Sequence, residues 1–284
     1  MSRLVTVVVP NFNGADYLRD SIESVLAQDY KNLEVIVVDD GSTDASIAIL
    51  ERYSGKIKVF KQFNKGSAAA RNFGISLAKG EFIALLDSDD IWKVNKLSTQ
   101  MKLLEDQNLD LVYCAGQEFS NSSADGEVHI PKYSGDCSAY FRRFPAKGII
   151  ELGCSTAVFR TSLLEFSGSF DESFLGAAED WDFFRRYTKF ANVGYSLEVL
   201  VRYRKHSGSI TARSLKDYYE GNRHAIVKMF QETPDIGVFE KRIIWIKFHL
   251  MISKSYFKIS DYLNSFKSLI PLFSPVIKGR PPRY

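Results

Sequence analysis

The chain has 284 residues, of which 45% are hydrophobic and 25% are charged, which is an ordinary globular composition. Its three cysteines, Cys114, Cys137 and Cys154, form neither a zinc motif nor a disulfide framework, so a reducing cytoplasm is the expected setting. The apolar run before Pro10 is too short for a signal peptide, and no uncharged apolar stretch approaches the roughly 18 residues that a membrane span needs.

Short apolar runs alternate with helical patterns along residues 1–115. The helical segments carry apolar residues at helical spacing or many alanines, and Gly80 ends one of them. Strands that alternate with helices in this way predict a mainly parallel, doubly wound sheet flanked by helices. Strands are expected at residues 4–9, 34–38, 57–60, 82–86 and 109–115, and helices at 17–26, 44–53, 66–78 and 96–107.

The pattern changes after residue 115. Residues 116–148 are rich in Ser, Gly, Asn and Pro, which indicates a long loop region. A strand is expected at 153–160, a helix at 179–189 and a further strand at 195–204. From Leu215 to Leu269 the pattern is helical, and several prolines after it indicate an irregular end.

An acidic turn follows the apolar run 82–86. Asp87, Asp89 and Asp90 stand within four residues of one another, and such like charges repel unless a cation or hydrogen-bond donors compensate them. Carboxylates without a nearby cysteine suit Mg²⁺ or Mn²⁺, and ligands of open α/β sheets bind beyond the carboxyl ends of the strands. The motif therefore predicts a metal and phosphate site, and the alternative is a solvated turn that caps the next helix.

Charge is distributed unevenly along the chain. From Lys241 to Tyr284 there are nine Lys and Arg residues and one acid, Asp261, so this stretch carries +8 and the rest of the chain −5. Its Phe- and Ile-rich composition does not fit a nucleic-acid interface. Two interpretations stay open: a helical hairpin packed on the rest of the protein, or a helix that lies on an anionic membrane.

Several segments together carry a resemblance to a known family. They are VTVVVPNFNGADYL, SIESVLAQDY, LEVIVVDDGSTDAS and KGSAAARNFGISLAKGEFIALLDSDDIW, followed later by SGSFDESF, AAEDWDFF and YRKHSGSIT. In this order and spacing the chain resembles the bacterial family 2 inverting glycosyltransferases over residues 4–211. The resemblance implies a GT-A fold with a helical C-terminal appendage. It also implies a catalytic domain at 1–212, divided into a nucleotide-binding half (1–115) and an acceptor-side half (116–212), and a basic helical extension at 213–284.

The resemblance also implies a set of nucleotide-binding residues, in which Asp39 accepts a hydrogen bond from the base and Arg71 lies near the nucleotide. Asp39 and Asp40 could instead cap the following helix, and Arg71 could be an ordinary surface residue. The full set is Pro10, Asp39, Asp40, Arg71, Asp87 and Ser88.

Metal and catalytic residues are implied in the same way. Asp89 is the expected ligand of Mn²⁺ or Mg²⁺, with His206 as a second ligand unless its role is structural. Asp180 is the expected general base, and Glu179 its supporter or a contact of the donor sugar. The alternative for this pair is that its charge complements a helix dipole.

The resulting hypothesis is a metal-dependent hexosyl- or N-acetylhexosaminyltransferase that uses a nucleoside-diphosphate sugar, UDP-linked before dTDP-linked. Its expected acceptor is a surface glycan or a lipid-linked glycan precursor, and peripheral contact with the inner face of an anionic cell membrane is possible. The alternative is a non-catalytic sugar-nucleotide-binding protein of the same fold. A nucleotidyltransferase is disfavoured because Pro10–Gly14 is not a Gly-rich, basic loop.

Overall fold

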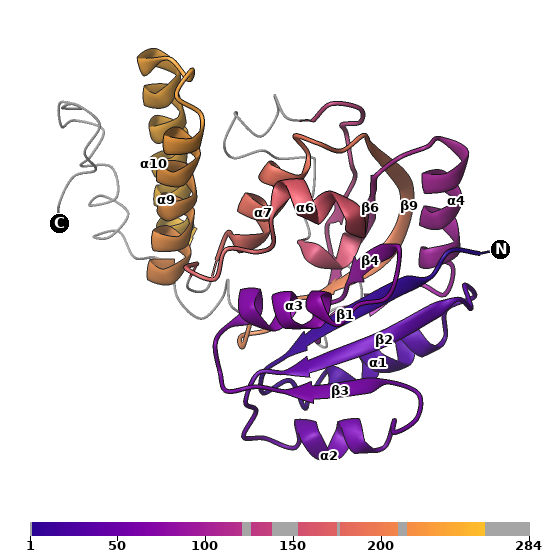
Figure 1. The fold of residues 1–284 in the computed structure, drawn as a ribbon. Coiled ribbons are helices and arrows are strands. Elements are labelled where there is room, and N and C mark those ends of the chain that lie inside the picture. The colour runs from indigo at the N-terminus through magenta and orange to yellow at the C-terminus, as the bar shows by residue number, and fades with distance from the viewer. Residues whose placement is uncertain (1, 121–125, 138–152, 175–176, 210–214, 259–284) are drawn as a thin grey trace.

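A computed structural model describes residues 2–120, 126–137, 153–174, 177–209 and 215–258. Its centre is one sheet in the order β3-β2-β1-β4-β8-β6-β9-β5, with β7 paired to β6 (Figure 1). The strands are β1 Val5–Asn11, β2 Leu33–Asp39, β3 Lys58–Lys61, β4 Phe82–Leu85, β5 Ile91–Trp92, β6 Leu111–Phe119, β7 Val128–His129, β8 Val158–Arg160 and β9 Val193–Arg204.

Parallel pairing builds the N-terminal half of the sheet. β1 lies between β2 and β4, with Val8 opposite both Ile36 and Leu85, and β3 pairs with the outer side of β2. Because these strands are parallel, their carboxyl ends meet at one edge, and the turns that follow them lie together. The predicted mainly parallel α/β sheet is confirmed.

The second half of the sheet mixes directions. β8 runs antiparallel to β4 and β6, β9 runs parallel to β6, and β5 runs antiparallel to β9. Two expectations need correction here. Part of the expected loop 116–148 is strand, because β6 continues to Phe119 and pairs with β7. The expected strand 153–160 starts only at Val158, after a 3₁₀ turn at Cys154–Thr156.

Helices cover both faces of the sheet. Alternate residues of β1 point to opposite faces: Val7 and Val9 pack with Ile22 and Leu97, whereas Val8 packs with the cluster that contains Ile75 and Phe183. Figure 1 shows α1 behind the sheet and α3 in front of it. The helices are α1 Leu18–Leu26, α2 Ser46–Glu51, α3 Ser67–Ser76, α4 Lys96–Asp106, α6 Leu164–Ser167, α7 Glu179–Tyr187, α9 Leu215–Glu232 and α10 Val238–Lys258.

The helical pattern predicted from Leu215 is confirmed up to Lys258, and the rest of it, to Leu269, lies outside the described residues. The long helices α9 and α10 pack against each other at the side of the molecule, beyond α7 (Figure 1). Among the described helices, none is long and apolar enough to cross a bilayer.

Candidate active site

The turn after β2 holds Asp39 at the carboxyl edge of the sheet. Asp39 pairs in register with Asn11 of β1, next to Pro10, and is almost fully buried. One of its carboxylate oxygens accepts a hydrogen bond from Asn11 Nδ2 at 2.9 Å, and the other accepts one from the Ser42 amide at 3.0 Å. These two donors fix the orientation of the Asp39 carboxylate.

Asp40 organises the start of α3. Its Oδ1 accepts hydrogen bonds from Gln62 Nε2 at 2.7 Å and from the Lys65 amide at 2.8 Å, and its Oδ2 accepts one from the Gly66 amide at 2.8 Å. The acid at the start of α2 is Asp44, which precedes the N-cap residue Ala45 and whose Oδ1 accepts a hydrogen bond from the Ser46 amide at 2.9 Å. Asp40 therefore holds the loop in front of α3 and does not cap α2.

Arg71 on α3 joins two acidic groups that are far apart in the sequence. Its guanidinium donates to Asp87 Oδ1 at 2.8 Å and to Glu179 Oε1 at 2.9 Å. It also lies over the ring of Phe170, 5.4 Å from the centroid. The Arg71 side chain is only 6% exposed, so it is not an ordinary surface residue.

The acids after β4 meet an imidazole from the segment that follows β9. His206 Nε2 lies 2.9 Å from Asp89 Oδ2, and the His206 ring packs 4.4 Å from the ring of Tyr17. Burial raises the pKa of Asp89, and the charge of Asp87 raises it further. Asp90 is fully buried, and burial and the charges of Asp89 and Asp87 raise its pKa well above the ordinary value. Asp89 and Asp90 therefore hold a proton more readily than a free aspartate does.

Asp89 and His206 together fit a divalent cation. They offer one carboxylate and one imidazole at the sheet edge, where burial and the charge of Asp87 disfavour the ionised form of Asp89 and a cation would favour it. The described parts of the chain contain a second group of potential metal ligands. One ligand atom each from Glu118, Glu127 and His129 lies within 4.8 Å of the others. A cation already offsets one of the two carboxylate charges of that second group, because Lys205 Nζ lies 2.6 Å from Glu118 Oε2.

Glu179 and Asp180 open α7, after Ala178 turns the chain with a φ of 69°. Glu179 Oε1 accepts hydrogen bonds from Ser67 Oγ at 2.8 Å and from Arg71. Burial raises the pKa of Glu179, but Arg71 and Ser67 outweigh burial and hold it below the ordinary value. The Glu179 carboxylate is therefore held in its ionised form.

The environment of Asp180 shifts its pKa in the opposite direction to that of Glu179. Burial, followed by the charge of Glu179, raises the pKa of Asp180 to about 6. Its Oδ1 accepts a hydrogen bond from the Trp181 amide at 2.7 Å. Of two neighbouring carboxylates, Glu179 keeps a permanent partner while Asp180 is poised to take up a proton near neutral pH.

Some residues at this edge make contacts that no sequence pattern predicted. Arg204 donates to the Asp89 carbonyl at 2.9 Å and to Asp20 Oδ2 at 2.8 Å, so it supports the acidic turn. Ser88 faces the loop after β1, where its Oγ lies 3.1 Å from the position that a Cβ on Gly14 would take. Tyr218 of α9 lies in the field of Asp180: burial raises the pKa of the Tyr218 phenol, and the Asp180 charge raises it further.

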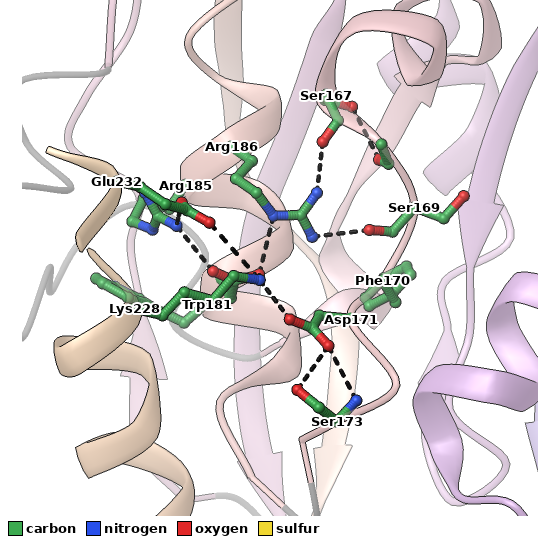
Figure 2. A network of polar contacts seen from close by, with 12 residues as sticks. Ser167, Ser169, Phe170, Asp171, Ser173, Trp181, Arg185, Arg186, Lys228 and Glu232 are labelled. Atoms are coloured by element: carbon green, nitrogen blue, oxygen red, sulfur yellow. Dashed lines mark hydrogen bonds and ion pairs between the residues drawn. The ribbon is translucent and has the colours of Figure 1, made fainter. Parts of the chain in front are cut away.

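Helix α7 is tied to α9 by a network of ion pairs (Figure 2). Asp182, which is fully buried, accepts hydrogen bonds from Arg185, Arg186 and Lys228, each at 2.9 Å. Lys228 also pairs with Asp171 at 2.5 Å, in the loop that leads to α7. Lys228 of α9 therefore connects the C-terminal helices to the helix that carries Glu179 and Asp180.

Comparisons with known sequences identify relatives over the whole chain. Residues 6–166 match the family described as "Glycosyl transferase family 2". An uncharacterized glycosyltransferase of Rickettsia typhi is 31% identical over 288 residues, covering 98% of this chain and 87% of its own length. The Escherichia coli UDP-Glc:alpha-D-GlcNAc-diphosphoundecaprenol beta-1,3-glucosyltransferase WfgD is 37% identical over 170 residues, covering 59% of this chain and 64% of its own length.

Solved structures share the fold. Residues 1–349 of Staphylococcus aureus TarS, in complex with UDP-GlcNAc, superpose with a TM-score of 0.68 at 22% identity over 95% of this chain and 81% of that one. The mannosyltransferase PcManGT of Pyrobaculum calidifontis, in complex with GDP-Man and Mn²⁺, superposes with a TM-score of 0.62 at 20% identity over 94% of this chain and 74% of that one.

Proposed function

This chain belongs to glycosyl transferase family 2, and on that premise we propose that it transfers a sugar, with inversion, from a UDP-sugar to an acceptor hydroxyl. Its architecture is the GT-A fold. The observation that carries the proposal is the chain of contacts from Asp87 through Arg71 to Glu179, next to an Asp180 whose pKa is about 6. This chain of contacts brings the acidic turn after β4 and a candidate base to one edge of the sheet.

Asp180 would act as the general base of a single displacement. Its carboxylate would accept the proton of the acceptor hydroxyl as that oxygen forms a bond to the anomeric carbon. The bond from that carbon to the diphosphate oxygen would break on the opposite face, and the nucleoside diphosphate would leave with the electron pair. Glu179 would stay ionised on Arg71, so that its charge keeps the pKa of Asp180 raised.

The nucleotide would lie along the carboxyl edge of β1, β2 and β4. Asp39 is fixed by Asn11 and Ser42, yet its oxygens keep lone pairs that could accept the N–H of a uracil ring. In this proposal Arg71, Asp87 and Ser88 face the ribose and diphosphate, Pro10 lines the base pocket, and Asp40 acts indirectly by shaping the loop before α3.

A divalent cation would be held by Asp89 and His206. We favour Mn²⁺ over Mg²⁺ because imidazole is a better ligand for Mn²⁺. Bound there, the cation would neutralise negative charge on the departing diphosphate. Arg204, which donates to the Asp89 carbonyl, and Tyr17, which packs on His206, would keep the two ligands in place.

The proposed acceptor is a growing surface glycan or a lipid-linked precursor of one. A relative that is 37% identical over 59% of this chain is named for a diphosphoundecaprenol-linked acceptor, which supports this choice. Such an acceptor would bring the enzyme into peripheral contact with the inner face of an anionic membrane. We divide the chain into a catalytic domain at 1–212, with halves at 1–115 and 116–212, and an extension at 213–284 that contributes Tyr218 and Lys228 to the surroundings of α7.

A panel of nucleotide sugars tests the proposal directly. UDP-glucose and UDP-N-acetylglucosamine, with Mn²⁺, should raise the melting temperature more than GDP-mannose does. A ligand at about 100 times its dissociation constant adds about 2.7 kcal/mol to the free energy of unfolding. Slow metal-dependent hydrolysis of the same donor should accompany this stabilisation.

The alternative function, a non-catalytic sugar-nucleotide-binding protein, predicts a different result from the same panel. Such a protein would be stabilised by a nucleotide sugar without hydrolysing it or transferring its sugar to any glycan acceptor. Stabilisation by no nucleotide sugar at all would contradict both functions. Asp180 favours the catalytic function, because a carboxylate with a pKa of about 6 is unneeded for binding alone.

A further inference from the structure

Helix α10 is apolar on two opposite sides. On one side Ile244, Phe248 and Ile252 are buried and pack with Ile226 and Met229 of α9. The rings of Phe248 and Tyr219 stack there with their centroids 5.3 Å apart. This inner side gives the two helices a small core of their own, which accounts for one of the two apolar sides.

The opposite side of α10 exposes large apolar side chains. Phe239 is 77% exposed, Leu250 45% and Ile246 38%. An α-helix advances about 100° per residue, so these three positions fall within about 40° of one another around the helix axis. They form one apolar stripe along α10, directed away from the inner core.

Exposed cations border this stripe on both sides. At about 100° per residue, Arg242 lies on one side of the stripe, and Lys247 and Lys254 lie on the other. All three are exposed. We call the six residues Phe239, Arg242, Ile246, Lys247, Leu250 and Lys254 the outer face of α10. An apolar stripe flanked by exposed cations is typical of a helix that lies in the interface of an anionic bilayer.

The orientation of this face is fixed relative to the rest of the protein. Lys228 and Glu232 bind α9 to α7 through Asp182 and Arg185 (Figure 2). The α9 backbone also lies directly against the loop before α7, because a Cβ on Gly221 would come within 2.5 Å of the Ala177 carbonyl oxygen. With α9 held in this way and α10 packed on it, the outer face of α10 points away from α9.

We propose that the outer face of α10 is a docking site for the surface of an anionic membrane. Residues 259–284 are a poor cover for it, because they carry four Lys and Arg residues and one acid and would bring further positive charge to a basic face. A second copy packed face to face would oppose the same cations. Anionic headgroups complement the charges, and the acyl boundary accommodates Phe239, Ile246 and Leu250.

This inference does not depend on the transfer reaction, because the outer face of α10 includes none of the residues proposed for catalysis. The face would hold the protein at the lipid surface with α10 parallel to it, which agrees with the finding that no described helix can cross a bilayer. Tyr218 lies on α9, in the field of Asp180, so the docked helix pair would also bring the candidate base near the membrane.

Co-sedimentation of the full chain with vesicles tests the proposal. Vesicles of phosphatidylcholine and phosphatidylglycerol should bind the protein at about 0.05 M salt and much less at about 0.5 M, and vesicles of phosphatidylcholine alone should bind weakly. Lys247→Gln combined with Lys254→Gln should weaken binding by about fivefold per charge. Phe239→Ser combined with Leu250→Ser should weaken it at either salt concentration.

Matched controls lie outside helices α9 and α10. Phe63 is 90% exposed and Lys56 is exposed, so Phe63→Ser and Lys56→Gln remove the same chemistry from the nucleotide-binding half and should bind vesicles like the wild type. Melting temperatures should not change in any variant, because every substituted side chain is exposed. Wild-type binding by the outer-face variants, or no binding of the wild type to anionic vesicles, would overturn the proposal. A lipid-free dimer that the outer-face variants dissociate would overturn it as well and make the face a contact between copies.

Discussion

Two acidic groups stand at the same edge of this sheet, and they are compensated in different ways. The group after β4 gathers Asp87, Asp89 and Asp90, and the only partner of the Asp89 carboxylate that the described side chains provide is the imidazole of His206. Arg71, a cation whose charge is permanent, pairs with one acid of each group: with Asp87 in the first and with Glu179 in the second. The neighbouring acids differ in their partners, because Asp89 meets the imidazole of His206, whereas Asp180 Oδ1 accepts a hydrogen bond from the Trp181 amide.

This difference indicates what each group is built to receive. Burial and the charge of Asp87 raise the pKa of Asp89. A divalent cation bound there would favour the ionised carboxylate and lower that pKa. Around Asp180, burial and Glu179 raise the pKa to about 6, which suits the uptake of one proton. One acidic group is therefore suited to a metal ion and the other to a proton, and experiments can separate the two roles.

The largest expected effect is on turnover, in the variant Asp180→Asn. The amide keeps the shape of the side chain but cannot accept the proton, so kcat should fall by about 10²–10⁴ while the affinity for UDP stays within a few-fold of the wild type. Steady-state kinetics and calorimetry with UDP measure the two quantities.

Asp106→Asn provides the control, because Asp106 is exposed at the end of α4. The pKa of Asp180 is raised in the folded state, so its ionisation opposes folding above about pH 6, and Asp180→Asn should not lower the melting temperature at pH 8. Near wild-type turnover in Asp180→Asn would move the base elsewhere, with Glu179 as the next candidate.

The contrast between the two groups also explains how far the sequence alone could lead. The strands β1, β2 and β4 are continuous apolar runs that end in turns, so both their positions and the edge where Asp39 and Asp87 lie were predictable. Two-residue β5 has no pattern of its own, because its place depends on pairing with β9. The extension of β6 to Phe119 likewise depends on its partners β7 and β9, while its sequence is polar enough to suggest a loop.

The contacts that set the chemistry of the site are long-range, and residue patterns alone did not reveal them. Arg71 and Glu179 are 108 positions apart, and their ion pair was not expected. Asp89 and His206 are 117 positions apart, and only the family resemblance placed them together. Asp40 looked like a nucleotide contact or a helix cap, but its acceptor positions are used by amides 25 and 26 residues later. Motifs predicted which residues gather at the edge, but only the folded chain assigns a partner to each.

The second prediction concerns the acidic group after β4, in the variant Asp89→Ala. Loss of a direct ligand should reduce the Mn²⁺-dependent part of UDP affinity by on the order of 10²-fold. Removing a residue that only hydrogen-bonds to a metal ligand already lowers metal affinity by about 10–100-fold. Calorimetry with UDP, with and without Mn²⁺, measures this part. The melting temperature without metal should not fall, because burial disfavours the ionised form of the Asp89 carboxylate that the variant removes.

An exposed acid offers the matched control for that experiment. Asp16→Ala removes a carboxylate from the loop after β1, and it should keep the full dependence of UDP affinity on Mn²⁺. If Asp89→Ala kept the same dependence, Asp89 would not be a ligand, and the acidic turn after β4 would have only a structural role.

The third prediction is the pH dependence of kcat. Below a pH of about 6 Asp180 becomes protonated and cannot act as a base, so kcat should fall about tenfold per pH unit as the pH decreases, and level off above about 7. Glu179→Gln should move this acid limb to lower pH. The substitution removes the Glu179 charge, which raises the pKa of Asp180. It also frees Arg71, whose positive charge lowers the pKa of Asp180. An acid limb that stays in place in Glu179→Gln would contradict the coupling of the two carboxylates.

The smallest expected effect comes from the link between α7 and α9, in the variant Lys228→Met. Asp182 would keep Arg185 and Arg186, so we expect a loss of about 1–2 kcal/mol in the free energy of unfolding, less than for a buried charge that loses every partner. Because Lys228 fixes the helix that begins at Glu179 and Asp180, kcat should fall a few-fold. The affinity for UDP, which we propose to bind at the other acidic group, should stay unchanged.

The conservative variant separates this positioning role from general damage to the fold. Lys228→Arg keeps a cation within reach of Asp182 and Asp171 and should restore most of kcat, whereas Lys216→Met, at an exposed position near the start of α9, should leave both kcat and stability unchanged. A fall in UDP affinity equal to the fall in kcat would mean that α9 supports the whole edge rather than the proton-accepting group alone, with Arg71 as the side chain that joins the two acidic groups.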